Sequence, residues 1–120
     1  MMARFLKGGR VGANTGSGIR FLDEAGVRKR LRMPALIEAM ERALVQISSD
    51  GVVQPVRLIL PVEKHQGFFG VMPAYAGVLG AKLVTFYPRN VGIPTHHAVI
   101  LVFREETGEP LAVLDGRLIT

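Results

Sequence analysis

The sequence contains no cysteine and no tryptophan among its 120 residues, and it has no long apolar run. Without cysteine there is no disulfide framework, no zinc site built on thiolates and no cysteine nucleophile. The longest apolar stretches, 98–103 and 56–62 (interrupted by Arg57), are far shorter than the ~20 residues that span a bilayer. The lack of cysteine is compatible with a reducing cytoplasm, which is the location that we expect.

Acidic residues are missing from the first part of the chain. Fifteen Lys and Arg against ten Asp and Glu give a formal net charge of +5. Arg4, Lys7, Arg10 and Arg20 lie in the first twenty residues, so the remaining hundred are nearly neutral, with eleven basic and ten acidic groups. A nucleic-acid-binding protein normally carries its positive charge on its folded part. We therefore expect no nucleic-acid partner and, given the short apolar runs, no membrane partner.

Residues 1–18 hold five glycines and no periodic apolar pattern, which predicts a flexible basic tail. Gly12, Gly16 and Gly18 do not form a dinucleotide-binding loop, because that motif has another spacing and needs a strand before it and a helix directly after it. An organelle-targeting peptide stays open as an alternative for this tail.

Helix signals follow. Residues 19–22 have the composition of a short strand, and Asp23 then opens a first helix that ends in a basic run, as the helix dipole favours. Pro34 suits the first position of a second helix, which ends at Asp50-Gly51. Glu38 and Arg42 are four residues apart in this second helix, in the order that favours an ion pair.

After Gly51 the pattern changes to β-branched and aromatic runs separated by turn residues. We expect strands over 52–62, 67–72, 81–87, 97–104 and 111–114, with a tight turn at 106–109. The predicted fold class is α+β: two N-terminal helices followed by a mostly meandering β-sheet. Residues 19–120 would form this domain.

Two cations stand inside these apolar strands, Arg57 in VRLIL and Lys82 in AKLVTF. Because an unpaired buried charge is costly, each one either faces water or meets an anion. The functional alternative is a carboxylate site, in which Arg offers a bidentate fork and Lys a movable charge or a proton. Periodicity leaves both alternatives open.

The adjacent pair His96-His97 does not predict a metal site. Neighbouring residues of a strand point to opposite faces, and no cysteine or cluster of carboxylates accompanies the two histidines. One of them can face a pocket, either as a structural residue or in proton transfer. His65 lies in a polar turn and is expected at the surface.

Six ordered motifs resemble the ornithine cyclodeaminase/mu-crystallin family, in particular its ketimine reductase branch. They cover residues 19 to 120 and read QPVR (54–57), GVMPAY (70–75), KLVTFY (82–87), PTH (94–96), ETGEPLA (106–112) and DG (115–116). The resemblance implies a homodimeric, two-domain α/β enzyme that uses NADPH or NADH, here represented by the substrate-binding and dimerisation domain alone. The chain stops at residues 118–120, before the positions of the family's Arg-Thr pair and Rossmann domain, so we expect this domain to be truncated and inactive alone.

The resemblance also implies roles for individual residues. Arg57 would bind the substrate carboxylate, and Lys82 would contact the amino or imine end as a substrate-binding and catalytic residue. Thr95 and His96 match positions near the nicotinamide cofactor, whereas His97 stands where the family often has Gln. The implied activity is NAD(P)H-dependent reduction of cyclic ketimines. The alternatives are an ornithine cyclodeaminase-type lyase and a non-catalytic module for ligand binding or dimerisation.

Overall fold

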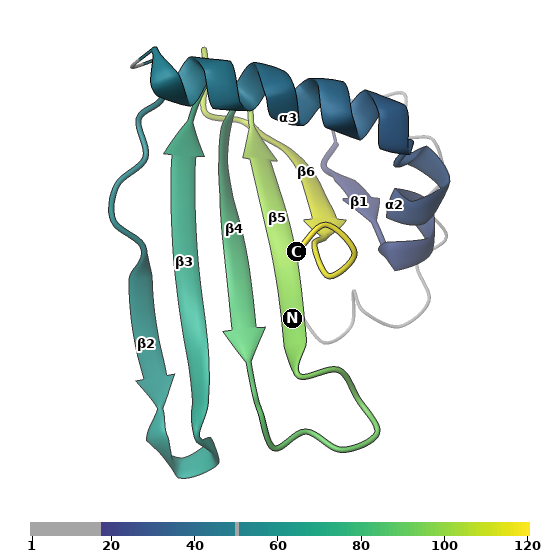
Figure 1. Cartoon of the computed structure of the whole chain (residues 1–120), viewed down its shortest axis with the longest axis vertical. Helices are drawn as coiled ribbons and strands as arrows, with labels where there is room; N and C mark the ends of the chain where they lie inside the picture. The colour runs from purple at the N-terminus through teal and green to yellow at the C-terminus, as the bar shows by residue number, and fades with distance from the viewer. Residues whose placement is uncertain (1–17, 50) are drawn as a thin grey trace.

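A six-stranded mixed sheet forms the body of the computed structural model, which describes residues 18–49 and 51–120 (Figure 1). The predicted tail therefore lies outside the described residues, apart from Gly18. The elements are β1 (Arg20–Leu22), α2 (Glu24–Arg30), α3 (Met33–Ser48), β2 (Leu58–Val62), the 3-10 turn η1 (Glu63–His65), β3 (Gly67–Tyr75), β4 (Leu79–Phe86), β5 (His96–Phe103) and β6 (Pro110–Asp115).

The strand order in the sheet is β1-β6-β5-β4-β3-β2. Strands β2 to β6 pair antiparallel with their neighbours in the chain, and the short β1 runs parallel to β6 at the other edge. This arrangement confirms the predicted fold class of two helices followed by a meandering sheet.

Helix α2 begins where the sequence places it. The Asp23 carboxylate accepts a hydrogen bond of 2.7 Å from the backbone N–H of Gly26, which satisfies one of the free donors at the helix N-terminus. Glu24 and Arg28 form an ion pair of 2.9 Å one turn apart. Val27 is buried where the helix contacts β1 and β6, so this short helix is held by packing as well as by its cap.

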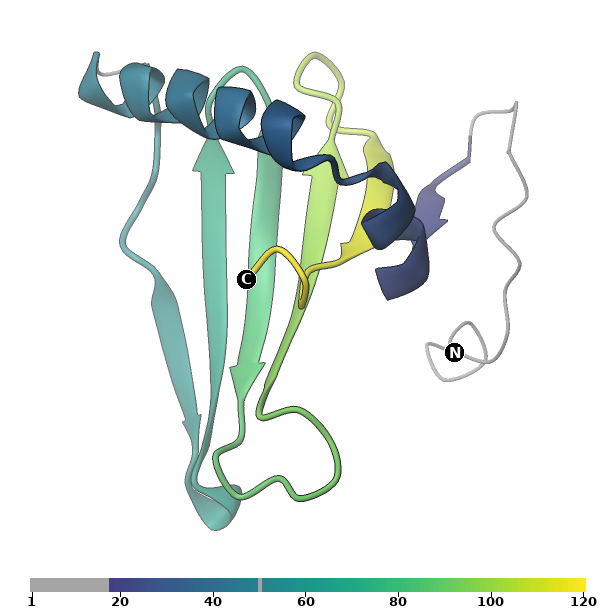
Figure 2. The same ribbon diagram turned by 45° about the vertical axis from the view of Figure 1, so that its right-hand side comes forward.

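Helix α3 has the predicted amphipathic pattern but buries little of it. The helix starts at Met33, with Pro34 in its first turn, and ends at Ser48; Asp50 lies outside the described residues. The predicted pair Glu38–Arg42 is present at 3.9 Å. Ile37, Met40 and Leu44 are each more than half exposed. Figure 2 shows why: α3 crosses the ends of the strands rather than lying flat along the sheet.

The predicted strand over 52–62 is wrong in its first half. Strand β2 begins only at Leu58, and before it Val53 alone is bonded to β3, through Tyr75. Strands β3 and β4 are longer than predicted, because the connection between them shrinks to residues 76–78. There Gly77 has a φ of +69°, a conformation that a residue without a side chain adopts easily. Ala74 and Gly80, which lie between the two predicted strands, belong to β3 and β4 and are paired with each other.

The connection between β5 and β6 is the predicted tight turn. Gly108, with a φ of +75°, donates its N–H to the Arg104 carbonyl at 2.8 Å. The Arg104 side chain is paired with Glu109 at 3.1 Å across the turn. At the neighbouring corner the Glu105 carboxylate, which acts on the Tyr75 hydroxyl, raises the pKa of Tyr75.

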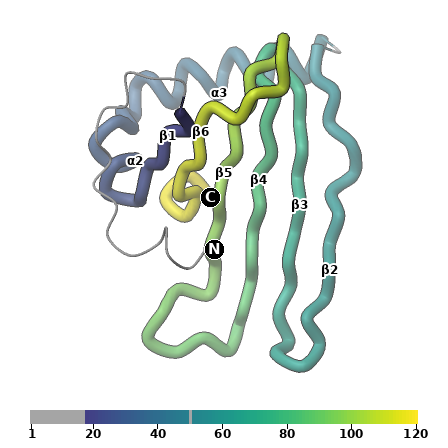
Figure 3. Tube along the Cα trace, turned by 180° about the vertical axis from the view of Figure 1, so that it is seen from behind, coloured from purple at the N-terminus to yellow at the C-terminus, as the bar shows by residue number. Residues whose placement is uncertain are grey.

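The two faces of the sheet differ. The front face, toward the viewer in Figure 1, bears α2 and α3 and the segment 116–120 that follows β6. From behind, no helix of the described residues crosses the back face (Figure 3). Val27 and Ala98 are the buried hydrophobic residues of the described part, so much apolar surface stays exposed. No helix within residues 18–49 and 51–120 is long and apolar enough to cross a membrane.

Candidate functional site

Strand register brings the predicted site residues to the front face. Lys82 of β4 is paired with Met72 of β3 on one side and with Ile100 of β5 on the other, so the three side chains share a face. Phe86 lies four residues further along β4, so it belongs to the same face. His96 of β5 is paired with Phe86 and therefore belongs to this face too. Ala98, between His96 and Ile100, packs under Gly116 on this face, which is the side covered by the segment 116–120.

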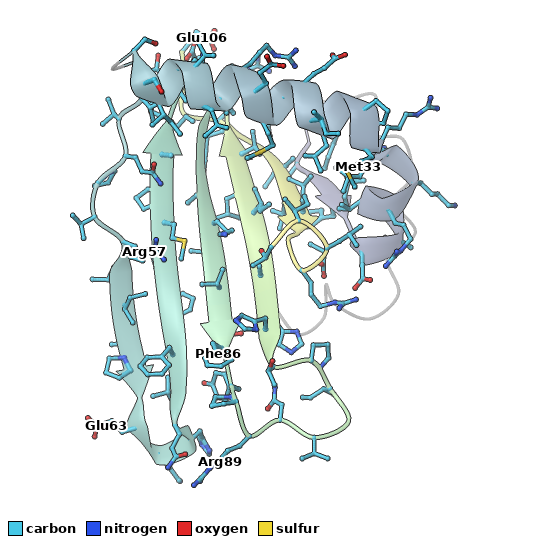
Figure 4. The ribbon with its side chains drawn as sticks, viewed as in Figure 1. Met33, Arg57, Glu63, Phe86, Arg89 and Glu106 are labelled. Atoms are coloured by element: carbon cyan, nitrogen blue, oxygen red, sulfur yellow. The ribbon has the colours of Figure 1, made fainter. Side chains whose placement is uncertain are left out.

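Arg57 joins this group from the edge of the sheet. It directly precedes Leu58, which is paired with Val71, so Arg57 stands on the face opposite to Val71 and thus on the face of Met72. In Figure 4 Arg57 lies at the margin of β3 on the side toward the viewer. Arg57 and Lys82 therefore flank Met72 from the two strands next to β3.

Long side chains allow these two cations to reach one small ligand. Residues at the same level on β2 and β4 lie about 10 Å apart at their Cα atoms, because strands are spaced ~4.8 Å apart, and Arg57 stands just before β2, outside the regular ladder. Long Arg and Lys side chains can both reach a ligand of a few atoms over Met72. Arg57 is exposed and Lys82 is half-buried, and among the described residues neither forms an ion pair with an acidic side chain. The geometry therefore provides two positive donors that are free to bind an anion.

His96 has defined neighbours at the lower end of the front face. Its ring stacks against Phe86 with centroids 4.4 Å apart and a tilt of 31° (Figure 4 labels Phe86). Its Nδ1 lies 3.4 Å from the Thr95 hydroxyl, at the point where the backbone N–H of Tyr87 is bonded to the Thr95 carbonyl. Thr95 and His96 thus present a hydroxyl and an imidazole at the start of β5.

The two histidines point to opposite faces, as the sequence predicts. His97 is paired with Thr85 and so belongs to the back face, away from Lys82. His65 is exposed in the 3-10 turn between β2 and β3. Within the described part of the chain, no three His, Asp or Glu side chains come close enough to hold a metal ion.

Sequence reasoning singled out Arg57, Lys82, Thr95 and His96, and the structure brings Arg57, Lys82 and His96 to one face. It assigned no role to Met72, which lies between the two cations, or to Phe86, which stacks on the imidazole. Both are apolar residues in apolar strands and carry no chemical signal of their own. The pairing register between the strands reveals them. Had the register of the β3–β4 hairpin been predicted from the sequence, it would have placed both residues on the face of Lys82.

Known proteins with similar sequences and structures share this architecture. The profile of the ornithine cyclodeaminase/mu-crystallin family matches residues 19–120. Ketimine reductase mu-crystallin from Mus musculus is 46% identical over 109 residues, which are 83% of this chain and 35% of the mouse protein. Delta(1)-pyrroline-2-carboxylate reductase from Bacillus cereus strain ZK is 34% identical over 98 residues, 78% of this chain and 30% of that protein.

Among solved structures, Delta(1)-pyrroline-2-carboxylate reductase from Thermococcus litoralis, in complex with NADH and L-proline, superposes with a TM-score of 0.80 at 36% identity. This match covers 82% of the present chain and 32% of the archaeal one. An archaeal alanine dehydrogenase dimer with bound NAD gives 0.78 at 31% identity, covering 82% and 31% of the two chains. The chain spans about a third of the length of these relatives. On the match over residues 19–120, it belongs to the ornithine cyclodeaminase/mu-crystallin family.

Proposed function

We propose that this chain is the substrate-binding and dimerisation part of an NAD(P)H-dependent oxidoreductase that reduces cyclic ketimines bearing a carboxylate. The observation that carries the proposal is the placement of Arg57, Lys82 and His96 on the same face of the sheet, with two cations that have no acidic partner among the described residues. Two of the proteins similar to this chain support the reaction class, because they are named as a ketimine reductase and a pyrroline-carboxylate reductase.

Arg57 binds the substrate carboxylate in this proposal. A guanidinium donates two parallel N–H bonds to a carboxylate, which fixes the orientation of the ligand as well as its charge. Arg57 stands at the sheet edge, where its exposed side chain can fold over Met72 as a ligand enters. The apolar surface of Met72 then receives the ring of the substrate.

Lys82 acts at the nitrogen end of the substrate. Its ammonium group is a hydrogen-bond donor that stabilises the negative charge developing on an imine nitrogen as the C=N bond is reduced. Because Lys82 is half-buried between Met72 and Ile100, it is held more firmly than an exposed lysine would be. We assign it the role of the catalytic residue of this chain.

Thr95 and His96 contact the nicotinamide end of the cofactor, which supplies the hydride when it is bound. The hydroxyl and imidazole at the start of β5 suit this contact, because a carboxamide needs both donors and acceptors. The phosphates need other partners. No glycine-rich loop leads into a helix within residues 18–49 and 51–120, so the described part of the chain does not offer the dinucleotide site itself.

A second copy of this chain covers the back face in the proposed enzyme. The relative in the archaeal comparison is described as a dimer. Here the back face carries exposed Leu58, Leu60 and Val99 with no helix of the described residues over it. Burial of such surface favours association.

The test is a titration of the chain with L-proline, followed at the backbone amides by nuclear magnetic resonance. We expect saturable shifts at Met72 and Lys82 and a loss of affinity of at least about tenfold in Arg57→Ala, because the carboxylate loses its charged partner. Lys64→Ala removes a cation of η1, at the far end of the hairpin, and serves as the control with unchanged affinity. Shifts that do not saturate, or that leave the front face unaffected, would reject the proposal.

A further inference from the structure

Residues 54–57 leave the sheet between two points at which the chain is fixed to β3. At the first point Val53 and Tyr75 exchange both backbone hydrogen bonds, at 2.8 and 2.9 Å. At the second point Leu58 is paired with Val71. Five residue steps separate Val53 from Leu58, but only four separate Tyr75 from Val71. The segment thus holds one residue more than the ladder needs and forms a β-bulge, seen in Figure 1 as the outward bow before β2.

Two prolines explain why the ladder is interrupted there. In an antiparallel ladder, pairs that exchange hydrogen bonds alternate with pairs that do not. Because Val53 and Tyr75 form an exchanging pair, a regular ladder would next pair Pro55 with Pro73. Neither proline has an N–H to donate. The hydrogen bonds between β3 and β4 are unaffected by Pro73, because its nitrogen points toward the 54–57 segment and away from β4.

The extra residue affects the position of Arg57 through the backbone and not through a side-chain contact. Val56 is 96% exposed, so its side chain packs against nothing and its contribution is the added length of backbone. Arg57 is the last residue of the bulge, directly before the chain returns to the ladder at Leu58. The path of the bulge therefore determines how far the Arg57 backbone stands from Met72 and Lys82.

We propose that the bulge of residues 54–57 sets the separation between Arg57 and Lys82, and through it the ring size of the carboxylate ligand that fits between them. This inference rests on the proposed function and adds a specificity determinant to it. The positioning element is the length of this segment: its one extra residue contacts no substrate and keeps Arg57 off the ladder. With the bulge removed, the Arg57 backbone would lie at the regular strand spacing of ~4.8 Å from β3, and the space over Met72 would narrow.

The test compares a variant without the bulge with two variants that retain it. The first lacks Val56 and carries Pro55→Val, so that residues 53–58 match residues 71–75 one to one and residue 55 can donate to the Pro73 carbonyl. Val56→Ala and Pro55→Val alone keep the full length and are the controls. Hydrogen exchange at residues 54–57 reports whether the segment joins the ladder. Titration with L-proline and L-pipecolate, with five- and six-membered rings, reports ring-size preference.

We expect slow exchange at residues 54–57 in the shortened variant and a change in the affinity ratio of at least about tenfold in favour of the smaller ring, since one methylene in a fitted site discriminates by about this factor. Both controls should keep the wild-type ratio. Slow exchange with an unchanged ratio would overturn the inference while leaving the proposed function intact. Failure of the wild-type chain to bind either amino acid would instead reject the proposed function, and this inference with it.

A lengthened variant keeps the inference testable if the shortened one does not fold. A glycine inserted after Val56 extends an exposed segment that lies outside the ladder, where added length is tolerated. We expect it to shift the ratio toward L-pipecolate. A ratio equal to that of the wild-type chain would count against the bulge as the determinant of ring size.

Discussion

Arg117 binds both carboxylate oxygens of Glu24, although the two residues are 93 positions apart in the sequence. The Nε–Oε2 distance is 2.8 Å and the Nη2–Oε1 distance is 2.5 Å, and Arg28 shares the same carboxylate at 2.9 Å. The pair joins α2 to the turn that follows β6, on the side of the sheet that carries the candidate site. The Arg117 hydrogen bond, followed by that of Arg28, lowers the pKa of Glu24, and the Glu24 carboxylate raises the pKa of Arg117.

The lowered pKa predicts a pH dependence of stability. A carboxyl whose folded pKa lies below its ordinary value of 4.5 stabilises the fold above pH 4.5, and this contribution is lost as the pH falls through the lowered pKa. Glu24→Gln should therefore be less stable than the wild-type chain at neutral pH and approach it in strong acid. Urea unfolding of both proteins across this range measures the difference.

Glu38→Gln is the matched control for that experiment. Glu38 is exposed and lies 3.9 Å from Arg42 within one helix, and such pairs contribute little. Its unfolding free energy should follow that of the wild-type chain at every pH. If Glu24→Gln also follows the wild-type curve, the pair with Arg117 does not stabilise the fold.

Local signals in the sequence predicted most elements of this fold. Asp23 is a typical cap residue, and alternating β-branched residues mark the strands, so their existence follows from short-range physics. The pair of Glu24 with Arg117 could not be predicted, because it depends on how the two ends of the domain meet. The exposed apolar side of α3 was equally out of reach, since periodicity shows an apolar stripe but not what covers it.

The candidate site was predictable by residue type and not by arrangement. Arg57 and Lys82 stand out because a cation in an apolar strand is costly. Whether the two share a face depends on the pairing register, since a shift of one residue turns every side chain over. Alternation along the predicted strand 52–62 does not determine the face of Arg57, because the bulge at 54–57 adds one residue that a regular strand would not have.

Substitution of the two cations should separate binding from turnover. In a chimera that joins this chain to the remaining part of the mouse relative, Arg57→Ala should weaken substrate binding by roughly 2–4 kcal/mol. Arg57→Lys should restore only part of this, because a point charge does not replace two parallel hydrogen bonds. Lys82→Met keeps most of the side-chain volume, so turnover should fall more than affinity.

Steady-state kinetics with a cyclic ketimine measure these effects, with the affinity for NADPH as the internal control. Neither residue is expected near the phosphates, so cofactor affinity should stay the same in all three variants. Near-wild-type kinetics in both Arg57→Ala and Lys82→Met would mean that the two cations only face solvent.

The chain alone should not bind NADPH appreciably. Thr95 and His96 offer contacts for the nicotinamide end, but the described residues provide no glycine-rich loop at a helix N-terminus for the phosphates. Isothermal titration calorimetry should show no saturable heat with NADPH under conditions in which L-proline binds. Micromolar affinity for NADPH would contradict this expectation and would place a phosphate site in this part of the protein.

The bare back face predicts self-association, and two neighbouring residues of β2 allow a matched test. Leu60 belongs to the back face and is 55% exposed, whereas Ile59 belongs to the front face and is 46% exposed. A charge in an apolar interface is costly because it loses its hydration. If the back face joins two copies, Leu60→Lys should shift the chain toward monomer in sedimentation velocity. Ile59→Lys, of equal charge and similar exposure, should leave the dimer intact.

Two outcomes would contradict this prediction. A wild-type chain that sediments as a monomer and unfolds cooperatively would show that the back face needs no second copy. Equal effects of the two lysine substitutions would show that association depends on apolar exposure on both faces.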